Sequence, residues 1–136
     1  MTEQRILLHT CRIPVRWGDM DAYGHVNNTI YFRYCEQARV EWLEQGGFMV
    51  SLDQSDGPVI INAACTFMTP VTYPATVLVR LYAGAPGRSS LMNWYEISVE
   101  GEDTVYAEGS AKVVWMNHLT GKSVPLPESL RKQFEN

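Results

Sequence analysis

A short polar run in the first quarter of the chain combines carboxylate, imidazole and amide side chains. It reads Asp19-Met20-Asp21-Ala22-Tyr23-Gly24-His25-Val26-Asn27-Asn28. Carboxylate and imidazole groups are common general bases and acids. In an extended segment Asp19 and Asp21 would share a face, and their proximity would raise one pKa towards neutrality. The alternative for Asp19 is a structural one, hydrogen-bonding to the turn, and Asp21 alone could also be a turn or capping residue.

Two predicted elements position this run. Before it, Ile13, Val15 and Trp17 alternate with other residues in the period-two pattern of a half-buried strand. After it, Thr29 to Gln45 is predicted as a helix, with Asn27 or Asn28 as its cap. Gly46-Gly47 supplies the positive φ that ends such a helix. The order therefore places a carboxylate beside a helix N-terminus.

The rest of the chain indicates an α+β domain. In the helix Tyr31, Cys35, Ala38 and Trp42 follow the apolar stripe, and a mid-helix Cys35 is expected to be an inert buried thiol. Trp42 and Trp115 are expected in the core. Four more strands are predicted at Val59 to Phe67, Thr76 to Gly84, Leu91 to Glu100 and Thr104 to Met116. The short connections between the last three indicate antiparallel hairpins, hence one long helix against a five-stranded antiparallel sheet.

Composition excludes several classes of function. With 136 residues, a single domain spanning 1–136 is expected. Three separated cysteines without CxxC spacing indicate neither a disulfide framework nor zinc, and favour a reducing cytoplasm. No leader or membrane-spanning run is evident, and a net charge of −4 argues against nucleic acid. Asp19, Asp21, His25 and Glu36 match no standard metal-binding loop, so no metal is expected.

The string RWGDMDAYGHVNNTIYFRYCEQARVEWL, followed by four predicted strands, resembles the hotdog-fold acyl-CoA thioesterases of the 4-hydroxybenzoyl-CoA thioesterase type. The likeness runs from about Ile13 through Pro127. Its specific part is a DxDxxGxVxxxxY-like run from Asp19 to Tyr31. Looser support comes from Phe67, Tyr73-Pro74 and the tail Gly121 to Pro127.

The resemblance implies a central helix wrapped by the sheet, and active sites at the interface of a homodimer or homotetramer. It also implies hydrolysis of a thioester without a serine or cysteine nucleophile and without a cofactor, coenzyme A being part of the substrate. Asp21 carries over as the catalytic carboxylate, acting as general base or as nucleophile. Backbone amides at the helix start, around Gly24, Asn27 and Asn28, would polarise the carbonyl.

Further site residues are expected around this centre. His25 matches the histidine of the related plant acyl-carrier-protein thioesterases, although Tyr23 replaces their asparagine; the alternative is a histidine packed against the helix start. Tyr31 and Tyr34 are the expected acyl contacts. The hairpin Gly87-Arg88-Ser89-Ser90 is a candidate cradle for a phosphate of coenzyme A, or else a plain surface turn.

Two other functions remain open at this point. A hotdog hydratase or dehydratase acting on acyl thioesters would use His25 as its main base. A non-catalytic acyl-thioester or acyl-carrier-protein binding protein would keep the fold without turnover. The identity of the acyl group, and its delivery by coenzyme A or by an acyl carrier protein, are not determined by these residues.

Overall fold

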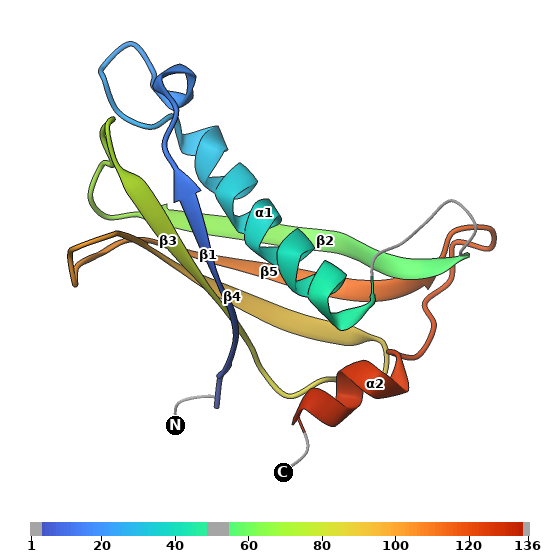
Figure 1. The fold of residues 1–136 in the computed structure, drawn as a ribbon. Coiled ribbons are helices and arrows are strands. Elements are labelled where there is room, and N and C mark those ends of the chain that lie inside the picture. Colours follow the sequence, from blue (N-terminus) through green and yellow to red (C-terminus); the bar gives the residue numbers. More distant parts are fainter. Residues whose placement is uncertain (1–3, 49–54, 135–136) are drawn as a thin grey trace.

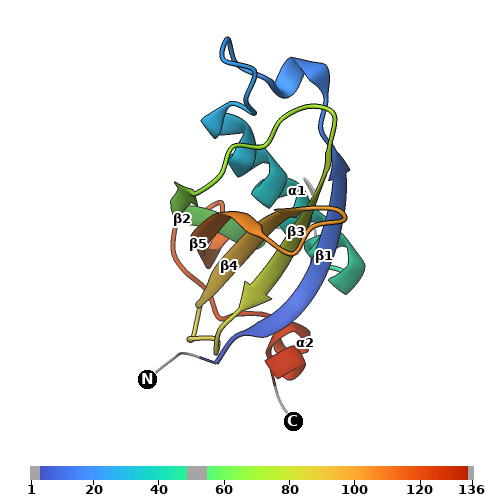
Figure 2. The ribbon, with the colours of Figure 1, turned by 90° about the vertical axis from the view of Figure 1, so that its left-hand side faces the viewer.

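The computed structural model describes residues 4–48 and 55–134. Its strands form one antiparallel sheet in the order β1-β3-β4-β5-β2, and the long helix α1 lies across one face of that sheet (Figures 1 and 2). This architecture confirms the predicted hotdog fold. The elements in chain order are β1 (Ile6–Pro14), the 3₁₀ turn η1 (Trp17–Asp19), α1 (Asn28–Gly46), β2 (Asp56–Phe67), β3 (Thr76–Ala83), β4 (Ser90–Val99), β5 (Val105–Asn117), α2 (Glu128–Arg131) and the 3₁₀ turn η2 (Lys132–Phe134).

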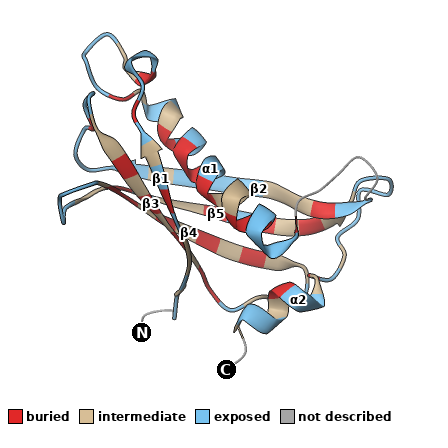
Figure 3. Ribbon diagram, in the orientation of Figure 1, coloured by how far each residue is buried: buried red, intermediate tan, exposed pale blue. Residues whose placement is uncertain are grey.

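Alternation of side chains explains how the sheet forms the core. In β3 and β4 every second residue is buried beneath α1, while the residues between them are half-buried (Figure 3). Val77, Val79 and Leu81 on β3 are among the fully buried residues. The period-two pattern of these strands therefore separates the helix-facing side of the sheet from its outer side.

Helix α1 begins and ends where its capping residues require. Asn27 is the N-cap, and its side-chain oxygen accepts a hydrogen bond from the Thr29 N–H. Gly47 closes the helix with φ 76°, a left-handed conformation that favours glycine. The buried stripe contains Tyr31, Cys35, Ala38 and Trp42 as predicted, but Phe32 is 40% exposed. The apolar surface near the helix start is therefore not fully covered within one chain.

The first strand lies earlier than the sequence pattern predicted. The strand β1 spans Ile6–Pro14, and Trp17 opens a 3₁₀ turn with 78% of its surface exposed. The predicted alternation of Ile13, Val15 and Trp17 was therefore wrong beyond Val15. The continuous run of β-strand-forming residues from Ile6 was the better signal, because β1 pairs along nearly its whole length with β3.

The joint between β1 and α1 is held by a buried carboxylate. Asp19 is 3% exposed and accepts hydrogen bonds from the Tyr34 hydroxyl at 2.8 Å and the Arg16 N–H at 3.0 Å. The Arg16 guanidinium lies 3.2 Å from its other oxygen. Burial by itself would raise the pKa of Asp19, but these three donors outweigh it and hold that pKa below its ordinary value. Asp19 is thus a structural residue.

Replacing Asp19 with alanine should destabilise the protein by about 2 kcal/mol at neutral pH, because the Tyr34 hydroxyl and the Arg16 N–H lose a charged acceptor. The stabilisation by the carboxylate is complete above the unfolded pKa of about 4, and it is lost as the pH falls through the lower folded value. Urea unfolding at several pH values measures this. The matched control is Asp103→Ala, which removes an exposed carboxylate. Equal stability of the two variants at pH 7 would contradict the role of Asp19.

Candidate functional site

The polar joint forms a tight turn that projects beyond the end of the sheet (Figure 1). The Asp21 N–H donates to the His25 carbonyl at 2.7 Å, and the Gly24 N–H donates to the Asp21 carbonyl at 3.1 Å. Gly24 has φ 79°, which this turn requires. A bridge between Met20 and Val26 closes the base of the turn. The backbone thereby fixes the position of the Asp21 side chain.

The Asp21 carboxylate has one oxygen engaged and one oxygen available. Its Oδ1 accepts from the Tyr23 N–H at 2.9 Å and from the His25 N–H at 3.3 Å. Its Oδ2 has no hydrogen-bond partner within residues 4–48 and 55–134. The alternative considered for Asp21, a residue that hydrogen-bonds within the turn, is therefore confirmed, and it leaves a second oxygen that can bind water. Asp21 is half-buried.

Asp19 and Asp21 do not form a catalytic pair. Asp19 lies in η1 with its carboxylate turned into the core, whereas Asp21 follows in the turn outside it. The expected proximity of the two carboxylates was wrong, because Asp19 is enclosed by Tyr34 and Arg16, whereas Asp21 is half-buried and accepts hydrogen bonds within its own turn. Both oxygens of Asp19 are engaged by Tyr34 and Arg16, and its side chain is buried, so this carboxylate is not available as a base.

His25 is exposed, so the predicted alternative of a histidine packed against the helix start was wrong. Its backbone groups close the turn around Asp21. No hydrogen bond to its imidazole is formed by the part of the chain that the structure describes. The ring is therefore free to meet a substrate or a second subunit.

Backbone amides around Gly24, Asn27 and Asn28 were expected to polarise the thioester carbonyl, but one free amide is found at the start of α1 in the described structure. The Asn27 side chain is occupied as the cap, accepting from the Thr29 N–H at 3.0 Å and from its hydroxyl at 2.8 Å. The Gly24 N–H is also occupied, so its expected role as an oxyanion donor does not fit. The Asn28 N–H, the first of the helix, has no acceptor among the described residues. Of the three expected amides, the Asn28 N–H is therefore the one best placed to donate to a carbonyl oxygen.

Tyr31 and Tyr34, the expected acyl contacts, are both buried in the core. The Tyr34 hydroxyl donates to Asp19, and the Tyr31 hydroxyl accepts from the Val71 N–H at 3.2 Å. Burial is the main cause that raises the pKa of Tyr31, and the nearby charge of Asp21 adds to the rise. Contact of either tyrosine with an acyl group stays a prediction.

The segment predicted to bind coenzyme A lies at the opposite end of the sheet from Asp21 of the same chain. Strand β3 begins next to the joint, where the Val15 N–H donates to Ala75, and runs away for eight residues, roughly 26 Å. The turn that follows it contains Gly87, Arg88, Ser89 and Ser90, and Arg131 of α2 binds two of its carbonyls (Figure 1). This segment could meet an Asp21 only in a second copy of the chain.

A cavity of about 230 Å³ lies between α1 and the strands β2 and β5. Sequence reasoning missed it. Its wall includes Phe32, Cys35 and Arg39 from the helix, and Ile60, Ala63 and Ala111 from the strands. The available signal was the run of small residues on two strands, Ala63-Ala64 and Gly109-Ser110-Ala111, which cannot fill the space beneath a helix.

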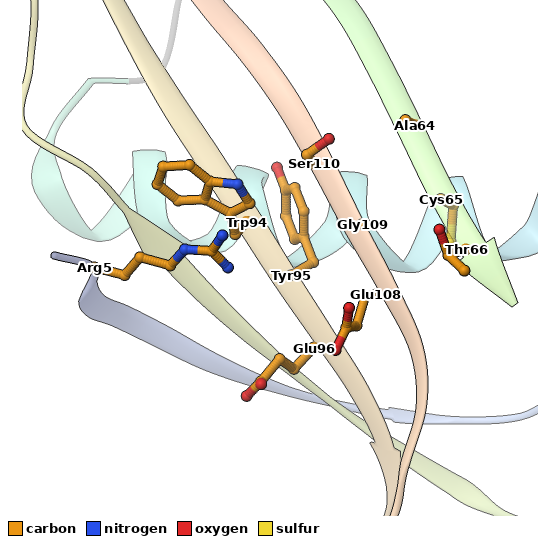
Figure 4. Close-up of a pocket in the computed structure, with 10 residues that line it drawn as sticks. All are labelled: Arg5, Ala64, Cys65, Thr66, Trp94, Tyr95, Glu96, Glu108, Gly109 and Ser110. Atoms are coloured by element: carbon orange, nitrogen blue, oxygen red, sulfur yellow. The ribbon is translucent and has the colours of Figure 1, made fainter. Parts of the chain in front are cut away.

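A second cavity, of about 220 Å³, is shown in Figure 4. The Arg5 guanidinium lies 4.1 Å from the ring centroid of Trp94, and Glu96 and Glu108 are direct cross-strand neighbours. Glu96 accepts from the Tyr82 hydroxyl at 2.9 Å. Cys65, Thr66 and Ser110 also line this cavity, but burial raises the pKa of the Cys65 thiol to about 11, and none of the lining residues belongs to the start of α1. The candidate site is therefore the joint and not this cavity.

Two negative findings apply to the described parts of the chain. Within them, His, Cys, Asp and Glu side chains nowhere gather in a group of three that could hold a metal ion. No helix there is both long and apolar enough to cross a bilayer. The three cysteines are all free thiols.

Comparison with known proteins identifies the family. Residues 15–134 match the model of the thioesterase-like superfamily. The PA2801 protein of Pseudomonas aeruginosa is 47% identical with a TM-score of 0.89, covering 95% of this chain and 99% of that one. The BH1999 gentisyl-coenzyme A thioesterase is 28% identical with a TM-score of 0.79, covering 90% and 98%. The long-chain acyl-CoA thioesterase FadM of Escherichia coli is 27% identical, covering 91% and 95%.

The family match covers the polar joint, the central helix and all but the first strand of the sheet. The likeness to solved structures extends over the whole architecture. This chain, with its hotdog fold, belongs to the thioesterase-like superfamily.

Proposed function

We propose that this protein is an acyl-CoA thioesterase that cleaves R–CO–S–CoA to a free acid and a thiol. Membership of the superfamily supports the reaction class. One observation carries the assignment of the site: the turn before α1 fixes Asp21 by one carboxylate oxygen and leaves the other unpartnered in the described structure. The same turn leads directly to Asn28, whose amide is free.

Asp21 and the helix start divide the chemistry between them. Asp21 takes a proton from water, which then attacks the thioester carbonyl. The Asn28 N–H, at the positive end of the helix dipole, stabilises the negative charge that develops on the carbonyl oxygen. Collapse of the tetrahedral intermediate expels the thiolate. In the second possible route Asp21 attacks the carbonyl itself, forming an anhydride that water then hydrolyses. Both routes use the same two groups, and neither requires a cofactor or a metal.

The relatives do not settle the acyl group. One solved structure is that of a gentisyl-coenzyme A thioesterase, and one curated relative is a long-chain acyl-CoA thioesterase. The first name describes an aromatic acyl group and the second an aliphatic one, and the two proteins are almost equally similar in sequence to this chain. We take coenzyme A as the carrier, with acyl carrier protein as the alternative. Free thiols at all three cysteines fit a reducing cytoplasm, the proposed location.

We also propose that the active protein is at least a homodimer. Among the strands that the structure describes, β2 is at one edge of the sheet and has β5 as its single neighbour. That edge carries exposed apolar side chains: Ile61 is 55% exposed and Phe67 is 44% exposed. A long apolar edge strand invites pairing with another chain. Antiparallel pairing of two β2 strands about a two-fold axis would bring opposite ends of the two sheets together, including the Arg88 turn of one copy and the joint of the other.

Replacing Asp21 with asparagine should reduce thioester hydrolysis by about 10²–10⁴-fold, because the amide cannot accept a proton or attack a carbonyl. The amide oxygen can still accept the Tyr23 and His25 N–H bonds, so the turn should persist. Release of free thiol from a panel of acyl-CoAs measures the loss. Asp103→Asn, at an exposed site, is the control. Full turnover by Asp21→Asn would refute the assignment.

Replacing His25 with glutamine distinguishes the thioesterase from a hydratase. In the proposed thioesterase the exposed imidazole assists at most in proton delivery to the leaving thiolate, so we expect a loss of less than about tenfold. In a hydratase that used His25 as base, this variant would lose its activity while Asp21→Asn kept it. A protein that binds acyl-CoA but turns over neither thioester nor enoyl substrate would indicate the binding function.

Replacing Ile61 with lysine should weaken self-association, because a charge would enter the apolar β2 edge. Light scattering coupled to size-exclusion chromatography measures the mass, and activity is followed as the protein is diluted. The control is Leu119→Lys, which alters an isolated exposed residue after β5. A wild-type protein that is monomeric and fully active would exclude an active site shared between two subunits.

A further inference from the structure

The cavity between α1 and the strands β2 and β5 has a polar end built from the core. The Arg39 guanidinium donates to the Tyr95 hydroxyl at 2.8 Å. That hydroxyl lies 3.5 Å from the Asn93 side-chain oxygen, and the Asn93 amide donates to the Tyr82 carbonyl at 3.4 Å. Tyr95 and Asn93 are 1% and 0% exposed. A polar chain thus runs from the cavity into the middle of the sheet.

Most of the N–H groups of Arg39 have no hydrogen-bond acceptor within the described residues. A guanidinium carries five N–H groups, and one hydrogen bond from Arg39 is formed within the described residues. None of the ion pairs between described side chains includes Arg39. The neighbouring Glu36 pairs with Arg33 instead, at 3.5 Å. A half-buried cation without a carboxylate partner favours a ligand that brings hydrogen-bond acceptors.

Glu36 and Ser110 also line the cavity, and the remainder of its wall is apolar. A Cβ at Gly109 would lie 3.4 Å from the Cys35 sulfur and 3.3 Å from the Ala64 carbonyl, so the small residue is needed for the close packing behind the cavity. Burial raises the pKa of the Cys35 thiol to about 12, so it is neutral and acts as an apolar wall rather than a nucleophile. With about 30 Å³ for each water-sized group, 230 Å³ holds roughly eight such groups.

The cavity follows the same face of α1 as the proposed reaction centre. Asn28, Phe32, Cys35 and Arg39 are spaced four, three and four residues apart, so they form one stripe along the helix. Eleven residues of helix correspond to about 16 Å from Asn28 to Arg39. Helical side chains point back towards the N-terminus, which brings the guanidinium nearer to Asn28. A thioester carbonyl held at Asn28 can therefore extend its acyl chain along Phe32 towards Arg39.

We propose that this cavity binds the distal part of the acyl group, and that Arg39, held by Tyr95, selects acyl groups bearing an oxygen acceptor at that end, as a hydroxyl or a carboxylate. The proposal rests on the proposed thioesterase function and adds its substrate class. An unsubstituted chain of the same length would leave the Arg39 N–H groups in the cavity without acceptors, and that mismatch lowers its selection.

The experiment compares three substrates of one length: octanoyl-CoA and its ω-hydroxy and ω-carboxy derivatives. We expect the wild-type protein to favour at least one oxygenated substrate by about tenfold or more in kcat/KM. Arg39→Met should reduce that ratio to near one. Tyr95→Phe should reduce the ratio less, since it removes only the group that positions Arg39. The two derivatives distinguish a hydroxyl from a carboxylate as the preferred acceptor.

Lys112→Met is the control, because Lys112 is an exposed cation that does not line the cavity and forms no ion pair within the described residues. A ratio of substrates is measured because a variant that is merely less well folded would lose activity towards all three alike. A wild-type protein without preference, or a preference that Arg39→Met leaves intact, would overturn the proposal.

The closing measurement separates this inference from the proposed function. Binding of the same three acyl-CoAs to Asp21→Asn, alone and combined with Arg39→Met, is followed by calorimetry. If Asp21→Asn still hydrolyses thioesters, the catalytic assignment fails, while the kcat/KM ratios still test Arg39. If hydrolysis stops as expected but the Asp21→Asn protein binds all three equally, the selection by Arg39 fails and the thioesterase assignment stands.

Discussion

The packing of one helix on one face of a five-stranded sheet is the constraint on which the rest of this structure depends. A helix with its side chains is about 10 Å wide, whereas five strands span roughly 20 Å. Helix α1 packs most closely on β1 and β3 and only lightly on β2. One helix cannot cover the whole face, so the side towards β2 and β5 remains partly uncovered. The cavity, the exposed Phe32 and the apolar edge of β2 all lie on that side.

The same packing explains why the joint is rigid although it projects from the sheet. The first turns of α1 bring Tyr34 and Tyr31 into the core, where their hydroxyls bind Asp19 and the Val71 N–H. These two contacts attach the joint to the helix and to the segment before β3. Asp21 is then placed by the backbone of its own turn, and one of its carboxylate oxygens has no partner in the described structure.

Two aspartates only two residues apart have opposite environments. Asp19 is enclosed by three donors and holds the fold, while Asp21 lies in a turn where one oxygen is unpartnered in the described structure. Asp19 ends the 3₁₀ turn η1 and is buried there, whereas Asp21 comes two residues later, after the extended residue Met20. Two arginines differ in a similar way. Arg16 forms an ion pair with the buried Asp19, whereas Arg39 donates to the Tyr95 hydroxyl and has further N–H groups for a ligand.

Local patterns in the sequence determined much of this protein: the helix with its Asn27 and Gly47 caps, the four later strands, and the polar joint with Asp21 before a helix start. Those features depend on periodicity and on turn chemistry, which act between neighbouring residues. Tertiary structure alone decided the order β1-β3-β4-β5-β2, the inward turn of Asp19, the separation of the Arg88 turn from Asp21, and the cavity at Arg39. These depend on which distant segments pack together, and the spacing of residues along a chain carries no direct record of that.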